Sequence, residues 1–197
     1  MMETSTEKYN LPLAKMSINP IPGRVDTKGV VSSVLISLAM IGMMQFGERL
    51  DTILFGGLFP VSGRIISFTL IGFGTMMYGL IPGLIVAEIN PFIGTATGSS
   101  PIAPFFFITN ALQAIAAIIS GKLIKNVVSL KFCFVYSILA TVLLTCAYIP
   151  LHIFYFKMPW EKLIPMYAFQ GAMTIFIPPF LIYGLLKTVK SAGFFEE

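Results

Sequence analysis

Polar side chains recur at helical spacing in the carboxyl-terminal half of the chain. Ser137, Thr141, Thr145, Tyr148 and His152 follow one another at steps of four, four, three and four residues. At about 100° per residue, these steps keep the five side chains in one narrow stripe along a helix. The stripe ends at His152, the only histidine of the chain, whose imidazole can bind a ligand or exchange a proton near neutral pH.

Two other segments carry similar stripes. Tyr167, Gln170 and Thr174 follow at steps of three and four, and Asn110 and Gln113 at a step of three. An amide or hydroxyl without a partner is costly in hydrocarbon, so these side chains should face one another, a cavity or a ligand. Hydrogen bonds between helices, of about 0.6 kcal/mol each, are the favoured explanation for the serines and threonines. A binding pocket is favoured for the three amides, which have more bonding groups to satisfy.

Three further residues have two interpretations each. Glu88 is either a hydrated carboxylate at the membrane edge or a group that contacts a ligand or takes part in gating. Trp160 and Glu161 follow His152 in an aromatic stretch, which suits either a binding pocket or the belt of Trp and Tyr side chains at a membrane surface. The sequence leaves these alternatives open.

Sequence signatures of the common catalytic sites are missing. The chain contains no HExxH, CxxC or GxGxxG motif and no Walker A motif. Ser99 or Ser100 would have to pair with His152 in a serine protease, but they lie in a predicted loop. One histidine and few acidic residues also disfavour a metal site. We therefore predict a binding protein and not an enzyme, with no cofactor in this chain.

The composition is that of an integral membrane protein. Of 197 residues, 56% are hydrophobic and 11% are charged, compared with about one quarter charged residues in soluble domains. At about 20 apolar residues per crossing, the length accommodates about six membrane spans and excludes a sizeable soluble catalytic domain. The net charge of +4 comes from basic residues beside apolar segments, where they set topology, so nucleic-acid binding is not expected.

We predict an all-α membrane protein, a bundle of six transmembrane helices with both termini in the cytoplasm. A polar tail covers residues 1–28, the membrane domain 29–190 and a carboxyl-terminal tail 191–197. Basic residues cluster in the polar tail, in the connector 121–131, and at Lys187 and Lys190 near the carboxyl end, so the positive-inside rule places all three regions on the cytoplasmic side. The predicted spans are 29–46, 62–73, 75–89, 101–119, 132–150 and 163–186.

The same topology places three polar or aromatic loops on the outer side. The first contains Glu48, Arg49 and Asp51, the second is an elbow over residues 88–100, and the third covers residues 152–162. We expect these loops to converge on one face and to border a binding site.

Gly29, Ser33 and Ser37 form a small-residue face on the first predicted span. Their spacing of four residues lets another helix approach closely. The approaching helix belongs either to a partner protein or to the same chain.

These features resemble the substrate-binding S component of energy-coupling factor (ECF) vitamin transporters. The face of Gly29, Ser33 and Ser37 is similar to the AxxxA contact surface of that family, and the long loop after it and the sequences "YGLIPGLIVAEI" and "NALQAIAAIISGKLIK" also match loosely. The resemblance covers most of the chain from 29 to 190. It implies a multi-pass protein of the plasma membrane that binds a vitamin, with a transmembrane T component and a pair of ATPase subunits as the partners that use ATP.

Within that family, the segment "HIFYFKMPW" is similar to thiamine-binding members. The likeness implies that His152, Trp160 and Tyr167 stack on or hydrogen-bond an aromatic heterocycle. Asn110 stands here where those members have a carboxylate, so a cationic ring lacks its counter-ion unless Glu88 supplies one. A neutral ring or another vitamin is equally open. We also expect the loop "GERLDTILFGGLFP" to act as a lid over the site.

The predicted binding residues form one set across the later spans. The set comprises Glu88, Asn110, Gln113, Tyr148, His152, Trp160, Tyr167 and Gln170.

Two alternative functions remain. A structural or assembly membrane protein would use the polar stripes only for helix packing, and an intramembrane enzyme would use His152 as a base.

Overall fold

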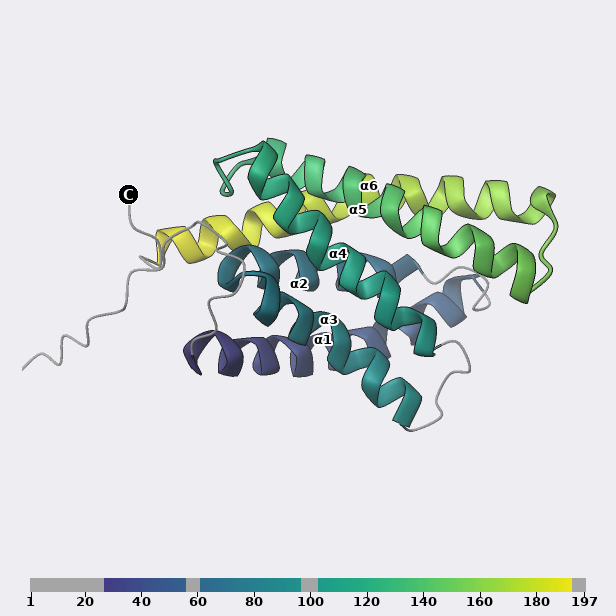
Figure 1. Ribbon diagram of the computed structural model, residues 1–197, viewed down its shortest axis with the longest axis horizontal. Coiled ribbons are helices and arrows are strands. Elements are labelled where there is room, and N and C mark those ends of the chain that lie inside the picture. Colours follow the sequence, from purple (N-terminus) through teal and green to yellow (C-terminus); the bar gives the residue numbers. More distant parts are fainter. Residues whose placement is uncertain (1–26, 56–60, 97–102, 193–197) are drawn as a thin grey trace, which may run out of the picture.

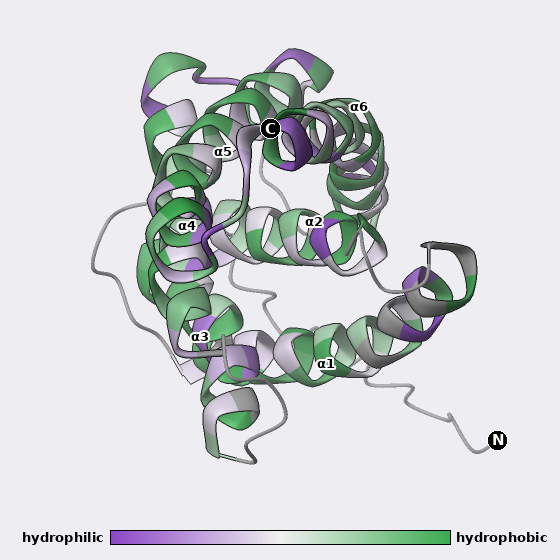
Figure 2. Cartoon of the chain, turned by 90° about the vertical axis from the view of Figure 1, so that its right-hand side faces the viewer, coloured by the Kyte–Doolittle hydropathy of each residue, from purple (hydrophilic) through white to green (hydrophobic). Residues whose placement is uncertain are grey.

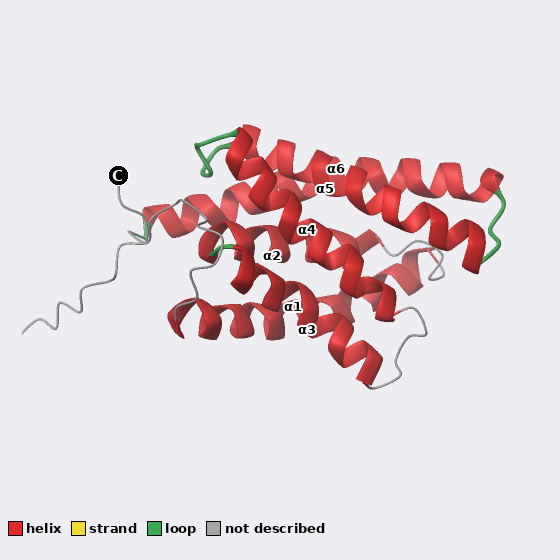
Figure 3. Cartoon of the chain, in the orientation of Figure 1, coloured by secondary structure: helices red, strands yellow, loops and turns green. Residues whose placement is uncertain are grey.

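The computed structural model describes residues 27–55, 61–96 and 103–192. These residues form helices joined by short turns, with no β-strand among them (Figures 1 and 3). The predicted all-α fold class is confirmed. The described helices are α1 (Thr27–Phe55), α2 (Val61–Tyr78), α3 (Leu80–Ala96), α4 (Ala103–Leu123), α5 (Leu130–Pro150), the π-helical η1 (Leu151–Tyr155) and α6 (Trp160–Ser191).

Four of these helical segments are long and apolar enough to cross a membrane. They are Gly29–Asp51, Pro104–Leu123, Leu130–Tyr155 and Trp160–Ser191, and Leu80–Ile93 is a shorter apolar helix. Large apolar side chains also point away from the bundle on α1, where Leu35 is 62% exposed, as contact with lipid tails would require. These observations indicate an all-helical membrane protein. Crossing by α2 and α3, and the cytoplasmic location of the termini, stay predictions.

Successive helices run in opposite directions, so α1, α3 and α5 end where α2, α4 and α6 begin (Figure 1). We call this the loop end of the bundle, and it brings together the helix ends next to the three predicted outer loops. Helix α2 lies at the centre, because α1, α3, α4 and α6 all pack against it (Figure 2). The start of α2 therefore lies among the ends of the other helices at the loop end.

Helix α1 is longer than predicted. It continues to Phe55, so Glu48, Arg49 and Asp51 lie on a helix, and the prediction that these three residues belong to a loop is wrong. Their part in gating stays a prediction. Residues 56–60, the rest of the predicted lid, lie outside the described residues.

Contacts with α2 explain why α1 continues. The Asp51 carboxylate accepts hydrogen bonds of 3.0 and 2.9 Å from the Ser62 backbone N–H, and this N–H has no partner within α2 because it belongs to the first turn. Gly47 lets α2 approach closely, since a Cβ there would lie 3.0 Å from Ile66 Cδ1. The end of α1 is therefore held as a helix by the start of α2.

The boundary between the second and third helices is at Gly79, not between the predicted limits Phe73 and Thr75. Gly79 has a φ of 94°, in the left-handed region that glycine adopts without steric cost. Gly74 lies inside α2, where a Cβ would come within 3.0 Å of Val86 Cγ2. Gly74 therefore admits a neighbouring helix and does not end α2.

The elbow is also partly helical. Helix α3 continues through Pro91 to Ala96, which corrects the predicted loop over residues 90–96, while 97–102 lie outside the described residues. At the other side of the site, α6 begins at Trp160, so the predicted loop 152–162 is replaced by a π-helical segment, a short turn and the first turn of α6.

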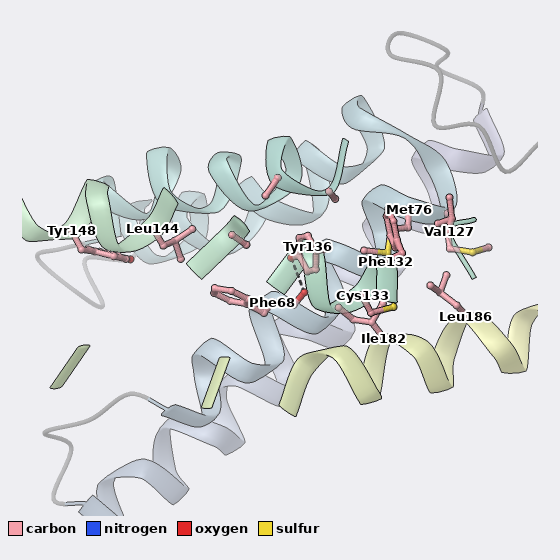
Figure 4. Packing of buried hydrophobic residues seen from close by; sticks show 14 residues of the cluster. Phe68, Met76, Val127, Phe132, Cys133, Tyr136, Leu144, Tyr148, Ile182 and Leu186 are labelled. Carbon is pink, nitrogen blue, oxygen red and sulfur yellow. Dashed lines mark hydrogen bonds between the residues drawn. The ribbon is translucent and has the colours of Figure 1, made fainter. Parts of the chain in front are cut away.

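Two clusters of buried side chains hold the bundle together. The Tyr136 hydroxyl donates a hydrogen bond of 2.9 Å to the Phe68 backbone oxygen, which connects α5 to α2 (Figure 4). Cys133 is buried beside this pair and Cys146 is exposed, and both are free thiols. The smaller cluster joins the first four helices. Its members are Met40, Ile71, Val86, Ala87 and Ala114.

Replacing Gly83 by alanine is expected to destabilise the bundle. A Cβ at this position would lie 2.9 Å from Thr75 Cα and would overlap the Thr75 hydroxyl, so α2 and α3 would have to separate. Overpacking of this kind costs about 1–3 kcal/mol. Gly184→Ala is the matched control, because a Cβ there meets nothing within 4 Å. Thermal unfolding in detergent should show a lower Tm for G83A than for G184A, and equal values would contradict the close packing of α2 on α3.

Candidate functional site

Polar and aromatic side chains from several helices meet at the loop end of the bundle. We call this group the loop-end cluster. It consists of Arg64 on α2, Thr109 on α4, Tyr148 on α5, His152 on η1 and Tyr167 on α6. Tyr148, His152 and Tyr167 were predicted from the sequence as binding residues, whereas Arg64 and Thr109 were not.

Tyr148 is the centre of the loop-end cluster. Its hydroxyl lies 3.0 Å from Thr109 Oγ1, and its ring lies under the guanidinium of Arg64, with Cζ 4.9 Å from the ring centroid. The Thr109 hydroxyl is also 3.3 Å from the Phe106 backbone oxygen, which can only accept a hydrogen bond. Thr109 therefore donates to the backbone, and Tyr148 donates to Thr109.

His152 connects Tyr148 to Tyr167. Its Nδ1 lies 2.9 Å from the Tyr148 backbone oxygen and 2.8 Å from the Tyr167 hydroxyl. Because the backbone oxygen only accepts, Nδ1 must carry the proton in that bond. The Tyr167 oxygen can then accept from the same N–H, which leaves the Tyr167 proton free to be donated to a ligand, and Nε2 as an acceptor.

The helix around His152 is wider than an α-helix. Pro150 has no backbone N–H and cannot donate the usual hydrogen bond to the preceding turn. The following residues form the π-helical segment η1, with the Phe156 N–H donating to the Leu151 oxygen at 3.2 Å. Such interruptions are frequent at functional sites, and this one turns the His152 ring toward α6.

Aromatic rings border the cluster. Phe156 lies 5.5 Å from the His152 ring, Tyr155 lies 5.1 Å from Phe156, and Phe105 of α4 lies 5.6 Å from Tyr155, measured between centroids. These rings form an apolar edge at the loop end. Trp160 begins α6 and is 54% exposed, so a contact between its ring and a ligand stays a prediction.

Arg64 was missed by the sequence analysis, although the sequence contained the signal. It lies inside the second predicted span, and an ionisable residue within a membrane-crossing segment is by default a candidate for function. A positive charge at the fourth position of α2 is also opposed by the positive end of the helix dipole. Neither helix formation nor lipid contact explains an arginine here.

The predicted amides divide into two groups. Asn110 Nδ2 donates to the Ala87 oxygen of α3 at 2.9 Å, and Gln113 Nε2 donates to Asn110 Oδ1 at 3.2 Å. Asn110 therefore bonds once across to α3, through Nδ2, and once within α4, through Oδ1. In contrast, three buried oxygens have no hydrogen-bond partner: Gln113 Oε1, Gln170 Oε1 and Glu88 Oε2. A bound ligand with hydrogen-bond donors could satisfy them.

The stripe of threonines connects helices. Thr141 and Thr174 form a hydrogen bond of 2.9 Å between α5 and α6. This bond is the packing role that was favoured for the serines and threonines.

Gly29, Ser33 and Ser37 are buried within the protein's own packing. Ser33 and Ser37 donate to the backbone oxygens one turn earlier, at 2.6 and 2.7 Å, and Ser37 also lies 3.5 Å from the Ile85 oxygen of α3. The small-residue face therefore admits a helix of the same chain. Contact between these residues and a partner protein stays a prediction. Their burial within the bundle does not support it.

Comparison of the chain with protein-family models, with curated proteins and with solved structures finds no match. Among the residues that the structure describes, no group of three His, Cys, Asp or Glu side chains could hold a metal ion. The candidate site is thus defined by its own geometry, in which a cation, hydroxyl groups and aromatic rings lie together.

Asn110→Ala is expected to lower the free energy of unfolding by about 1–3 kcal/mol. The change removes the bond to α3 and leaves the Gln113 amide without its acceptor. Ile108→Ala is the control on the same helix, because Ile108 is 64% exposed, and Tm in detergent is the measurement. An N110A protein with normal stability but no ligand binding would instead support the pocket role predicted from the sequence.

Proposed function

We propose that this chain is the substrate-binding subunit of a membrane transporter that takes up a small water-soluble molecule, a vitamin or a vitamin precursor. The resemblance to S components of ECF transporters supports this role. In that arrangement, a T component and a pair of ATPase subunits drive release, and ATP is used by these partners in the plasma membrane.

The loop-end cluster is the observation that carries the proposal. Packing networks in apolar bundles satisfy their own hydrogen bonds, because an unmet polar group is costly there. Here, with the His152 Nδ1 proton donated to the Tyr148 backbone oxygen, the Tyr167 hydroxyl proton and His152 Nε2 have no hydrogen-bond acceptor or donor among the described residues. A ligand that enters from the loop end would complete these bonds.

A packing role has its own support elsewhere in the protein. The hydrogen bonds of Thr141 with Thr174, of Asn110 with Ala87 and of Tyr136 with Phe68 connect neighbouring helices. An assembly protein would need no more than these. The two functions therefore differ in whether the loop-end cluster binds a small molecule.

Denaturing the purified protein should release a small molecule that mass spectrometry identifies. The same compound, added back, should raise Tm in proportion to RT ln(1 + [L]/Kd). A protein that releases nothing, and that no vitamin or precursor stabilises, would favour the assembly function.

Tyr167→Phe should weaken binding of the identified compound roughly 2- to 13-fold, because one hydrogen bond contributes about 0.5–1.5 kcal/mol. Tyr183→Phe on the same helix is the matched control, since Tyr183 packs against the hydrophobic core, 16 residues further along α6. Titration of thermal shift gives both affinities. Equal losses in the two variants would show that the tyrosine at 167 acts through stability and not through ligand contact.

A further inference from the structure

The charge at the loop-end cluster points to the chemical class of the ligand. We infer that the site binds a small molecule with a single carboxylate, which Arg64 and the Tyr167 hydroxyl hold between them. This inference rests on the proposed function, because it takes the loop-end cluster as the substrate site.

The guanidinium of Arg64 has no hydrogen-bond acceptor for its N–H donors among the described residues. Arginine is charged at every physiological pH, and Arg64 is partly buried near the start of the central helix. The face of Tyr148 attracts the guanidinium but supplies no acceptor for its five N–H donors. A carboxylate fits the planar fork of donors with two parallel hydrogen bonds.

The described acidic side chains do not neutralise Arg64. Asp51 uses its carboxylate on the Ser62 backbone N–H. Glu88 Oε2 is buried without a partner, and Glu161 is exposed in the first turn of α6. None of these three carboxylates pairs with Arg64, whose charge is therefore open to an outside anion.

A second donor lies in the same region. The Arg64 guanidinium lies on the ring of Tyr148, and His152 Nδ1 connects Tyr148 to the Tyr167 hydroxyl. Tyr148 donates its proton to Thr109, whereas Tyr167 accepts from His152 and keeps its proton available. A guanidinium and a phenol that both present donors match an anion better than they match a cation.

The charge also separates classes of ligand. A thiazolium or another cationic ring would be repelled by Arg64, which argues against the thiamine-like ligand suggested by the sequence. A phosphate monoester would bring close to two negative charges against Arg64, the single partly buried cation of the loop-end cluster, and an uncompensated buried charge is strongly unfavourable. A monocarboxylate matches the charge, and the rings of Phe105, Tyr155 and Phe156 suit its uncharged remainder.

The first test uses the unmodified protein and pairs of probes that differ in charge. Nicotinate with nicotinamide, biotin with biotinamide, and pantothenate with pantothenol are each titrated, and thiamine is included as a cation. Binding is read from thermal shift and from the fluorescence of Trp160, the only tryptophan. Mass spectrometry of the released molecule in both ion modes identifies the natural ligand independently.

A released molecule with one carboxylate is expected, or an acid that binds at least tenfold more tightly than its uncharged partner. A neutral or cationic molecule that is released, or that binds as tightly as the acids, would overturn the inference while the proposed function stood. No released molecule and no binding of any probe would overturn the proposed function, and the inference with it.

The second test changes the arginine. Arg64→Gln should weaken binding of the carboxylate roughly 10- to 100-fold, and Arg64→Lys less, because it keeps the charge but loses the planar fork. Lys122→Gln, exposed at the opposite end of α4, is the control and should bind normally. Circular dichroism and gel filtration check folding. An R64Q protein that folds and binds the acid as well as the unmodified protein would overturn the inference, and the paired probes keep it testable if R64Q does not fold.

Discussion

Close approach of neighbouring helices to α2 is the constraint on which the rest of the structure depends. A helix can pack against four others only if some of its side chains are small. Gly72 lies under the ring of Tyr136, where a Cβ would come within 2.6 Å of that ring, and Gly74 admits Val86. These contacts fix α2 in the middle of the bundle. They also determine where the first turn of α2, and hence Arg64, is placed.

The placement of Arg64 gives the loop end its chemical character. Because α2 is central, the guanidinium reaches Tyr148 of α5, and the break in α5 at Pro150 lets His152 connect Tyr148 with Tyr167 of α6. The loop-end cluster thus combines the guanidinium of Arg64, which does not stabilise the start of α2, with Tyr148 and Tyr167. His152 contacts both tyrosines and holds them in place. Elsewhere in the described bundle, the hydrogen bonds of Asn110, Tyr136 and Thr141 connect neighbouring helices, and these residues serve packing.

Several parts of the site followed from periodicity. Ser137, Thr141 and Tyr148 are buried on one side of α5, as a stripe spaced at three and four residues predicts. The same argument failed for helix ends. "GERLDT" contains charges that normally mark a loop, but Asp51 bonds to the start of α2, and that partner is only brought near by the fold. The predicted boundary between the second and third spans was misplaced for the same reason, since a sequence does not show that Val86 of the next helix fills the space beside Gly74.

The sequence by itself determined that this is an apolar, all-helical membrane protein, because hydropathy and helical spacing are properties of neighbouring residues. It also determined which faces of the later helices are polar. Only the tertiary structure decided what those faces meet: Asn110 bonds to a backbone oxygen of α3, the small face of Gly29 and Ser37 turns inward, and Arg64 joins the tyrosines. These outcomes depend on which helix lies at the centre, and that is set by packing between residues far apart in the chain.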